Sequence, residues 1–235
     1  MKPTRWFEKA NVAIEGVIYS VKTQRHMRYH LVAALGVLLV SLAVNITRTE
    51  FILLSLAIIL VLITEMLNTA IEVAIDMISE EYHPKAKIAK DIAAGVVLVA
   101  SIGALILAYL ILYPAIREAV ATGFWRVRKV PNDVIAFVSF AVVVIVVVIV
   151  KAVLGTGEPL RGGMPSGHAA VSFSLWVATI YLTGSLPLIA VTFLLAAMVS
   201  WSRWSSGVHR PREVLAGAFL GAGLTWLLFL LFSQE

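Results

Sequence analysis

The stretch from residue 51 to residue 76, FILLSLAIILVLITEMLNTAIEVAID, decides which fold the chain can adopt. Its first fourteen residues carry no charge, whereas its last twelve carry three carboxylates. A helix needs about 20 apolar residues to cross the hydrocarbon core of a bilayer. We therefore expect one long helix that crosses a membrane and continues through Asp76, with carboxylates at or near bilayer depth.

The composition of the whole chain also indicates an integral membrane protein. Of the 235 residues, 60% are hydrophobic and only 14% are charged, whereas a soluble domain carries about 25% charged residues. The absence of cysteine excludes disulfides and thiolate metal sites. The net charge of +5 suits an anionic membrane surface, and nucleic-acid binding is a poor explanation for so apolar a chain.

Apolar runs predict an all-α integral membrane protein with about seven spans. They lie at 31–47, 51–76, 92–116 and 134–150, in a hairpin of two spans within 169–202 that turns at 184–187, and at 214–234. Residues 3–27 mix apolar and charged side chains at helical spacing, which is typical of an amphipathic helix in the membrane interface. The expected domains are a membrane module at 1–113, a basic linker at 114–132 and a four-span bundle at 133–235.

The distribution of lysine and arginine predicts the orientation of the chain. The basic N-terminus and the loop that carries Lys85, Lys87 and Lys90 are expected on the cytoplasmic side, and the turn at 45–50 outside. Three spans then leave the linker outside, although it carries four basic residues. The next span returns inward and places two later motifs, at 161–168 and 202–213, on the cytoplasmic side.

The first candidate site is a polar stripe in the second span. Glu65, Asn68, Glu72 and Asp76 are spaced by three, four and four residues, so they share one helix face. Carboxylates at this depth are costly unless they face a protein interior, a cation or one another. Clustered carboxylates with an amide suit Mg²⁺ that arrives with nucleotide phosphates. An interhelical polar seam or an ion pathway fits the spacing equally well, and Asp76 also fits a helix that is leaving the membrane.

The residues around this stripe resemble a known family. The segment EMLNTAIEVAIDMISEEYHPKAKIAKDIAAGVV (65–97), together with FEKANVAIEGVI (7–18), is similar to the bacterial diacylglycerol kinase/undecaprenol kinase family over about residues 5–113. The resemblance implies a trimer of three-span subunits that uses Mg²⁺ and ATP, with active sites between subunits. Phosphoryl transfer depends mainly on positioning and charge neutralisation, so the residue types fit.

The resemblance also assigns roles by position. It implies that Glu65 is the base that takes the proton of a lipid hydroxyl and that Glu72 binds the metal. Gln24 stands where the family usually has a second metal-binding glutamate, and is expected to be a weak ligand. The run Arg28-Tyr29-His30 is more similar to the undecaprenol branch, which favours a polyprenol substrate. The residues assigned to the nucleotide are Asn68, Asp76, Lys90 and Asp91.

The second candidate site combines RGGMPSGH (161–168) with SRWSSGVHRPRE (202–213). Ser166 is a natural helix cap, and a helix N-terminus presents N–H groups to an anion. His209 and Glu213 are four residues apart, so the carboxylate can reach an imidazole nitrogen and set its tautomer. Two histidines at a phosphate support nucleophilic attack by one and leaving-group protonation by the other. Taken singly, each Arg or His also fits an interfacial side chain that extends to water.

Together these residues resemble the type-2 phosphatidic acid phosphatase superfamily, whose motifs are K-x6-R-P, P-S-G-H and S-R-x5-H-x3-D. The resemblance implies that His209 forms a phosphohistidine and that His168 is the general acid, with no metal needed. The chain departs at Glu213, where the family has Asp, and at Glu158, where it has Arg; the nearby Arg161 is the candidate replacement. Four spans stand where this superfamily usually has six. The residues expected to bind phosphate are Lys151, Arg161, Ser166, Gly167 and Arg203.

The two halves together predict a bifunctional enzyme in the bacterial cytoplasmic membrane. Phosphorylation of undecaprenol by ATP and hydrolysis of undecaprenyl diphosphate would both give undecaprenyl phosphate. A second hypothesis is a lipid phosphatase whose kinase-like half is only an oligomerising scaffold. Diacylglycerol, phosphatidic acid or phosphatidylglycerophosphate is the alternative lipid, and a transporter that uses the carboxylate stripe is the alternative from another class.

Overall fold

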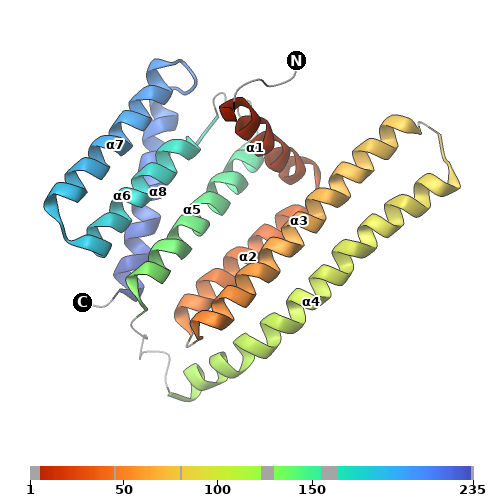
Figure 1. Cartoon of the computed structure of the whole chain (residues 1–235), viewed down its shortest axis with the longest axis horizontal. Coiled ribbons are helices and arrows are strands. Elements are labelled where there is room, and N and C mark those ends of the chain that lie inside the picture. Colours follow the sequence, from red (N-terminus) through yellow and green to blue (C-terminus); the bar gives the residue numbers. More distant parts are fainter. Residues whose placement is uncertain (1–5, 45, 80, 123–129, 155–162, 234–235) are drawn as a thin grey trace. The chain divides into compact units, whose positions relative to one another are not determined.

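A computed structural model describes residues 6–44, 46–79, 81–122, 130–154 and 163–233. This described part is helical, without strands (Figure 1). Its helices are α1 (Trp6–Thr23), α2 (Arg25–Ala43), α3 (Arg48–Ile78), α4 (Pro84–Thr122), α5 (Asn132–Leu154), α6 (Gly167–Thr183), α7 (Leu186–Ser205) and α8 (Pro211–Phe232).

The helices are long and apolar enough for a membrane protein. Within the described ranges, six of them qualify as membrane spans by length and composition: α2, α3, α4, α5, α7 and α8. The helix α6 is equally apolar in character but has 17 residues, the lower limit for crossing a bilayer. The chain is therefore an all-α, multi-pass membrane protein.

Contacts between residues divide the chain into two compact units. One unit is Thr23–Val127, and the other combines Met1–Lys22 with Arg128–Glu235. The second unit thus takes in most of α1, which the sequence places in an interfacial helix of the first module. Ile18, Ser20 and Val21 near the end of α1 are each at most 2% exposed. The bounds 1–113, 114–132 and 133–235 remain a prediction.

In the unit Thr23–Val127, α3 packs against both α2 and α4. The start of α3 is fixed by a capping box, in which the Thr47 backbone N–H donates to Glu50 Oε2 at 2.6 Å and the Glu50 N–H donates to Thr47 Oγ1 at 3.3 Å. Such reciprocal bonds satisfy N–H groups that the first turn of a helix leaves without partners. Beside this cap, an apolar cluster joins the three helices: Val44, Ile46, Leu54, Ile111 and Ala115.

Two helix boundaries differ from the sequence-based expectation. The predicted amphipathic helix at 3–27 ends at Thr23, because Gln24 adopts an extended conformation, and α2 begins at Arg25. At the other end of the unit, α4 continues through Pro114 to Thr122, so the first residues of the predicted linker are helical. A proline removes one backbone hydrogen bond from a helix, and the surrounding turns of α4 tolerate that loss.

In the other unit, α6 packs against α5, α7 and α8. The expected hairpin is present: α6 ends at Thr183, Gly184 takes a left-handed conformation with φ of 59°, and α7 begins at Leu186. Val143, Val147 and Ala170 form a buried core between α5 and α6, with α8 residues packed against it. Because α6 and α7 form a hairpin between α5 and α8, both predicted phosphatase motifs lie at the same end of the bundle.

Candidate active sites

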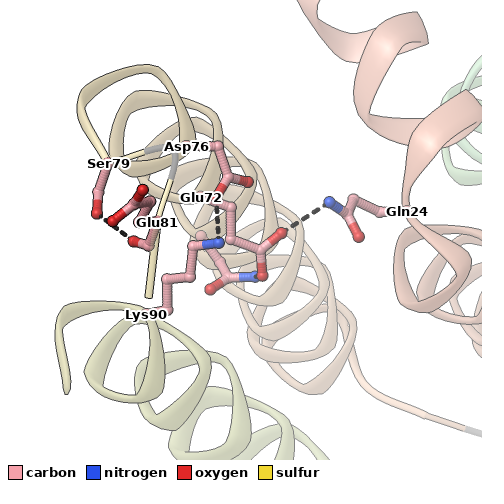
Figure 2. Close-up of polar contacts among 7 residues, drawn as sticks. Gln24, Glu72, Asp76, Ser79, Glu81 and Lys90 are labelled. Atoms are coloured by element: carbon pink, nitrogen blue, oxygen red, sulfur yellow. Dashed lines mark hydrogen bonds and ion pairs between the residues drawn. The ribbon is translucent and has the colours of Figure 1, made fainter. Parts of the chain in front are cut away.

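The polar stripe of α3 is organised around Glu72, which accepts a hydrogen bond at each carboxylate oxygen. Gln24 Nε2 donates to Glu72 Oε2 at 2.9 Å, and Asn68 Nδ2 donates to Glu72 Oε1 at 3.0 Å. Figure 2 shows Gln24, which precedes α2, facing Glu72 on α3. The structure thus brings together three residues predicted for metal and nucleotide binding, including the one that departs from the family pattern.

Glu65 and Asn68 are the buried members of the stripe. Glu65 is 3% exposed and Asn68 is 8% exposed. The amide oxygen Asn68 Oδ1 is buried and has no hydrogen-bond partner among the described residues. An open oxygen acceptor beside a carboxylate fits a hard cation, which prefers oxygen ligands.

The described residues contain no group of three or more His, Cys, Asp or Glu side chains that could hold a metal by themselves. This donor set still fits Mg²⁺, because Mg²⁺ is usually held by one or two carboxylates together with substrate phosphates. Glu72 would supply the carboxylate, and Asn68 and Gln24 would supply amide oxygens.

The residues predicted to hold nucleotide on α4 form ion pairs. Lys90 contacts Asp76 of α3 (Figure 2), and Lys87 contacts Asp91 one turn away on α4. These side chains are largely exposed at the α3–α4 end of the unit, so the pairs contribute little stability and are open to exchange for phosphate oxygens. No hydrogen bond within the described ranges joins them to Glu72, and Lys87 was missing from the predicted site residues.

The phosphatase-like site begins at Ser166, the N-cap residue of α6. Ser166 is fully buried, yet its hydroxyl makes no capping hydrogen bond and has no partner among the described residues. Ser166 is therefore the N-cap residue by its backbone conformation, and the expected hydrogen bond from its side chain is absent. The Ser166 backbone N–H donates to the Glu213 carbonyl oxygen at 2.9 Å, which joins the two motifs directly and leaves the Ser166 hydroxyl for another partner.

The second histidine is held by its own motif. His209 Nδ1 lies 2.8 Å from Glu213 Oε2, the contact that the four-residue spacing predicts. The same oxygen accepts the Arg210 backbone N–H at 3.2 Å. The His209 backbone N–H donates to the Arg203 carbonyl oxygen at 3.0 Å. A hydrogen bond at Nδ1 fixes the tautomer and leaves Nε2 as the nitrogen for chemistry.

Positive charge gathers on this site. Lys151 and Arg203 both lie close enough to His168 to act on it electrostatically. Lys151 is 6% exposed, and Arg203 Nε is buried without a hydrogen-bond partner in the described part of the chain. Buried donors of this kind fit an anion such as phosphate. Arg161, the candidate replacement for the missing arginine, lies outside the described residues, as do Glu158 and Pro159.

Burial is the largest influence on the imidazole of His209. It lowers the pKa of His209 below its usual value, while the Glu213 hydrogen bond acts in the opposite direction. The net lowering keeps the imidazole neutral at pH 7, the form that can attack phosphorus.

Gly167, also predicted to bind phosphate, is the first residue of α6 and directly follows Ser166.

Two glycines that sequence reasoning missed hold this site together. A Cβ at Gly217 would fall 2.3 Å from the Ser166 carbonyl oxygen, and one at Gly221 would fall 1.9 Å from the Ala170 carbonyl oxygen. The two glycines are four residues apart on α8, a spacing that lets membrane helices approach closely. That spacing was the sequence signal that could have revealed the contact.

The chain is thus a multi-pass membrane protein with two clusters of candidate residues for phosphoryl chemistry. Two family models match the chain, the prokaryotic diacylglycerol kinase family at residues 11–112 and the PAP2 superfamily at residues 152–235. The chain belongs to the prokaryotic diacylglycerol kinase family through its N-terminal part, and a PAP2 superfamily domain follows. It is therefore a lipid kinase fused to a phosphatase, and a kinase implies a nucleotide phosphate donor.

Several characterised proteins are similar to the N-terminal part. Undecaprenol kinase of Bacillus subtilis is 36% identical over 110 residues, which cover 47% of this chain and 89% of that protein. A diacylglycerol kinase of Synechocystis is 40% identical over 100 residues, or 42% of this chain and 57% of that protein. Diacylglycerol kinase of Escherichia coli is 32% identical over 103 residues, which cover 44% of this chain and 84% of that protein. No solved structure matches the chain.

Proposed function

We propose that the chain is a bifunctional enzyme that supplies undecaprenyl phosphate by two routes. Its kinase unit phosphorylates undecaprenol with Mg²⁺-ATP, and its phosphatase unit hydrolyses undecaprenyl diphosphate. The observation that carries the proposal is the presence in one chain of two clusters of the expected residue types, one around Glu72 and one around His209. Similarity to an undecaprenol kinase supports the choice of lipid, and both reactions then give the same product.

In the kinase unit, Glu65 acts as the general base. A buried carboxylate in an apolar span is well suited to take a proton from a lipid hydroxyl as its oxygen attacks the γ-phosphorus of ATP. Glu72, Asn68 and Gln24 would hold Mg²⁺, which would neutralise charge on the nucleotide phosphates. Lys90 and Asp91 lie three and two residues before Ala93, the first buried residue of α4, and bind the nucleotide in place of their exposed ion pairs.

A groove beside the carboxylate stripe offers room for the lipid tail. It has a volume of about 530 Å³ and lies between α3 and α4, with Leu60, Thr64 and Gly95 among the residues that line it. Leu60, Thr64, Asn68 and Glu72 follow one another at four-residue intervals, so the apolar groove leads along one face of α3 to the polar site. A molecule with an apolar tail and a hydroxyl head group matches this sequence of surfaces.

In the phosphatase unit, His209 Nε2 attacks phosphorus and forms a P–N bond while the P–O bond to the leaving group breaks. His168 donates a proton to the departing oxygen, and Lys151, Ser166, Gly167 and Arg203 hold the phosphate oxygens. Water, deprotonated by His168, then attacks phosphorus, so that inorganic phosphate leaves and His209 is restored. Glu213 keeps the attacking imidazole in the required tautomer.

The proposal also covers the membrane location, the orientation and the oligomeric state of the enzyme. We place the chain in the bacterial cytoplasmic membrane with its N-terminus in the cytoplasm, because the N-terminal segment is rich in lysine and arginine and the first turns of α4 carry Lys85, Lys87 and Lys90. The kinase unit assembles as a homo-oligomer, a trimer by analogy with its family.

One pair of variants tests the proposal directly. Purified chain is assayed with undecaprenol and Mg²⁺-ATP, and separately with undecaprenyl diphosphate and with phosphatidic acid. Glu65→Gln is expected to lose lipid phosphorylation and keep phosphate release, and His209→Ala is expected to show the reverse. Loss of both activities in one well-folded variant would contradict separate sites, and release of phosphate only from phosphatidic acid would contradict the choice of lipid.

A second candidate function is a phosphatase carried by an inactive, oligomerising kinase-like unit. It is favoured by Gln24, a neutral amide where the family usually has a metal-binding glutamate. Wild-type chain that fails to transfer phosphate from ATP to undecaprenol or diacylglycerol would support this candidate, whereas Mg²⁺-dependent transfer would eliminate it.

A further inference from the structure

Gln24 is an N-cap residue that does not cap its own helix. Its backbone is extended, with φ of −98° and ψ of 119°, and its side chain makes no capping bond to α2. Instead the side chain reaches Glu72, 48 residues later in the sequence (Figure 2). Polar side chains at N-caps usually satisfy the nearby backbone N–H groups, so a local explanation for this orientation is lacking.

The contact balances the charge of Glu72 without a metal. The half-buried carboxylate accepts one N–H from Gln24 and one from Asn68, so each oxygen has a neutral donor within 3.0 Å. Hydrogen bonds to an ionised acceptor are stronger than those between neutral groups. A glutamate at position 24 would place a second carboxylate at this distance, and two like charges so close repel unless a cation or proton lies between them.

We propose that Gln24 is a positioning residue whose amide replaces a cation at Glu72 in the nucleotide-free chain. Together with Asn68 it keeps the carboxylate seated while no metal is bound. The unpaired, buried Asn68 Oδ1 stays open for a cation that arrives with the nucleotide. Only the arrival of a cation with the nucleotide rests on the proposed kinase function. The contacts of the Gln24 and Asn68 amides with Glu72 exist without nucleotide.

The proposal predicts different responses to metal for three variants of the full chain without nucleotide. Wild type has the same melting temperature in EDTA and in Mg²⁺. Gln24→Glu melts lower in EDTA and recovers in Mg²⁺, whereas Gln24→Met, which has similar size but no donor, melts lower in both. Thr23→Glu adds a carboxylate at the neighbouring exposed position and is the matched control, with no recovery in Mg²⁺.

Binding of Mn²⁺ gives a second readout that a purely structural role would not change. Measured by electron paramagnetic resonance without nucleotide, the affinity of Gln24→Glu should exceed that of wild type by about tenfold, because the variant adds a carboxylate ligand beside Glu72, whereas the wild-type amide donates to Glu72 and does not bind the metal. If wild type binds Mn²⁺ as tightly as Gln24→Glu, or if Mg²⁺ raises the melting temperature of wild type equally, Gln24 is a metal ligand at rest and the proposal is wrong. A Gln24→Met chain that melts like wild type would also overturn it.

These measurements are independent of lipid phosphorylation. A chain that fails to phosphorylate lipid but shows the expected metal responses would overturn the kinase assignment and leave the role of Gln24 standing. If the chain phosphorylates lipid but the Gln24→Glu variant responds to metal as wild type does, the kinase assignment stands and the proposed role of Gln24 is wrong.

Discussion

Gly217 of α8 lies against the Ser166 backbone so closely that a Cβ at position 217 would fall 2.3 Å from the Ser166 carbonyl oxygen. The neighbouring atom is backbone and cannot turn aside, so Gly217→Ala must displace the start of α6. Overpacking of this kind costs about 1–3 kcal/mol. We expect Gly217→Ala to lose most phosphate release and to lower the melting temperature, while lipid phosphorylation by the other unit is unchanged.

Gly223 on the same helix provides the control for that substitution, since a Cβ there meets nothing within 4 Å. Gly223→Ala should retain phosphate release. If both variants lose phosphate release equally, the effect comes from glycine replacement in α8 generally and not from contact with Ser166.

The pH dependence of phosphate release should report the buried His209. Burial lowers the pKa of His209 below its usual 6.5, so the neutral nucleophile persists into more acidic solution and is lost only as pH falls through the lowered pKa. The acid limb of kcat/KM is therefore expected below pH 6.5. A limb at or above pH 6.5 would show that Glu213 outweighs burial.

Glu213→Gln should change both the rate and the position of that acid limb. The hydrogen bond and the negative charge of Glu213 raise the pKa of His209, so their loss moves the limb to lower pH. The rate should fall by up to about 10⁴-fold, as when the carboxylate that orients a catalytic histidine is removed from a serine protease. Rates of phosphate release measured across the pH range check both effects, and an upward shift of the limb would contradict the assignment.

The groove between α3 and α4 can be filled without disturbing its walls. A Cβ at Gly95 meets nothing within 4 Å, and leucine is a better helix former than glycine by roughly 1 kcal/mol. Gly95→Leu should therefore fold well and raise the KM for the lipid alcohol without changing that for ATP.

Gly103→Leu is the matched control, because Gly103 lies on the same helix with equal space around it but does not line the groove. Its lipid KM should equal that of wild type. A Gly95→Leu chain with unchanged lipid KM, or one that changes oligomeric state by light scattering, would assign the groove to something other than the lipid tail.

A buried hydrogen bond between α6 and α8 tests how the phosphatase bundle is held together. The hydroxyl oxygens of Ser174 and Thr225 are 2.7 Å apart, and both residues are at most 1% exposed. Thr225→Val should destabilise the chain by roughly 0.6–1.7 kcal/mol. Addition of Ser174→Ala should cost little more, because it removes the hydroxyl that Thr225→Val leaves without a partner. Equal, additive losses in a double-mutant cycle of unfolding free energies would contradict this coupling.

Helical periodicity made part of the fold and both candidate sites predictable. The spacing of Glu65, Asn68 and Glu72 placed them on one face of a long helix, and the spacing of His209 and Glu213 placed a carboxylate at the imidazole. Contacts within a helix follow from spacing, because residues three or four apart are neighbours on its surface. The apolar runs and the Gly184 turn similarly predicted the helices and the hairpin.

Contacts between helices could not be predicted in the same way. Nothing in the local sequence shows that Gln24 reaches Glu72, because that depends on the register of α2 against α3. The pairing of Ser166 with the Glu213 carbonyl depends in turn on the absence of a side chain at Gly217. The continuation of α4 past Pro114 was missed because a proline usually argues for a helix end, whereas a membrane helix tolerates it.

The tight turn at Gly184 and Ser185 has a use in determining topology. It joins α6 to α7 at the end of the bundle opposite to Ser166 and His209, and α6 is about 26 Å long at 1.5 Å per residue. An epitope or a single cysteine introduced at this turn, in a chain that has no other cysteine, is therefore a reporter for the opposite face. Whichever compartment labels the turn, the proposed phosphohistidine chemistry at His209 belongs to the other.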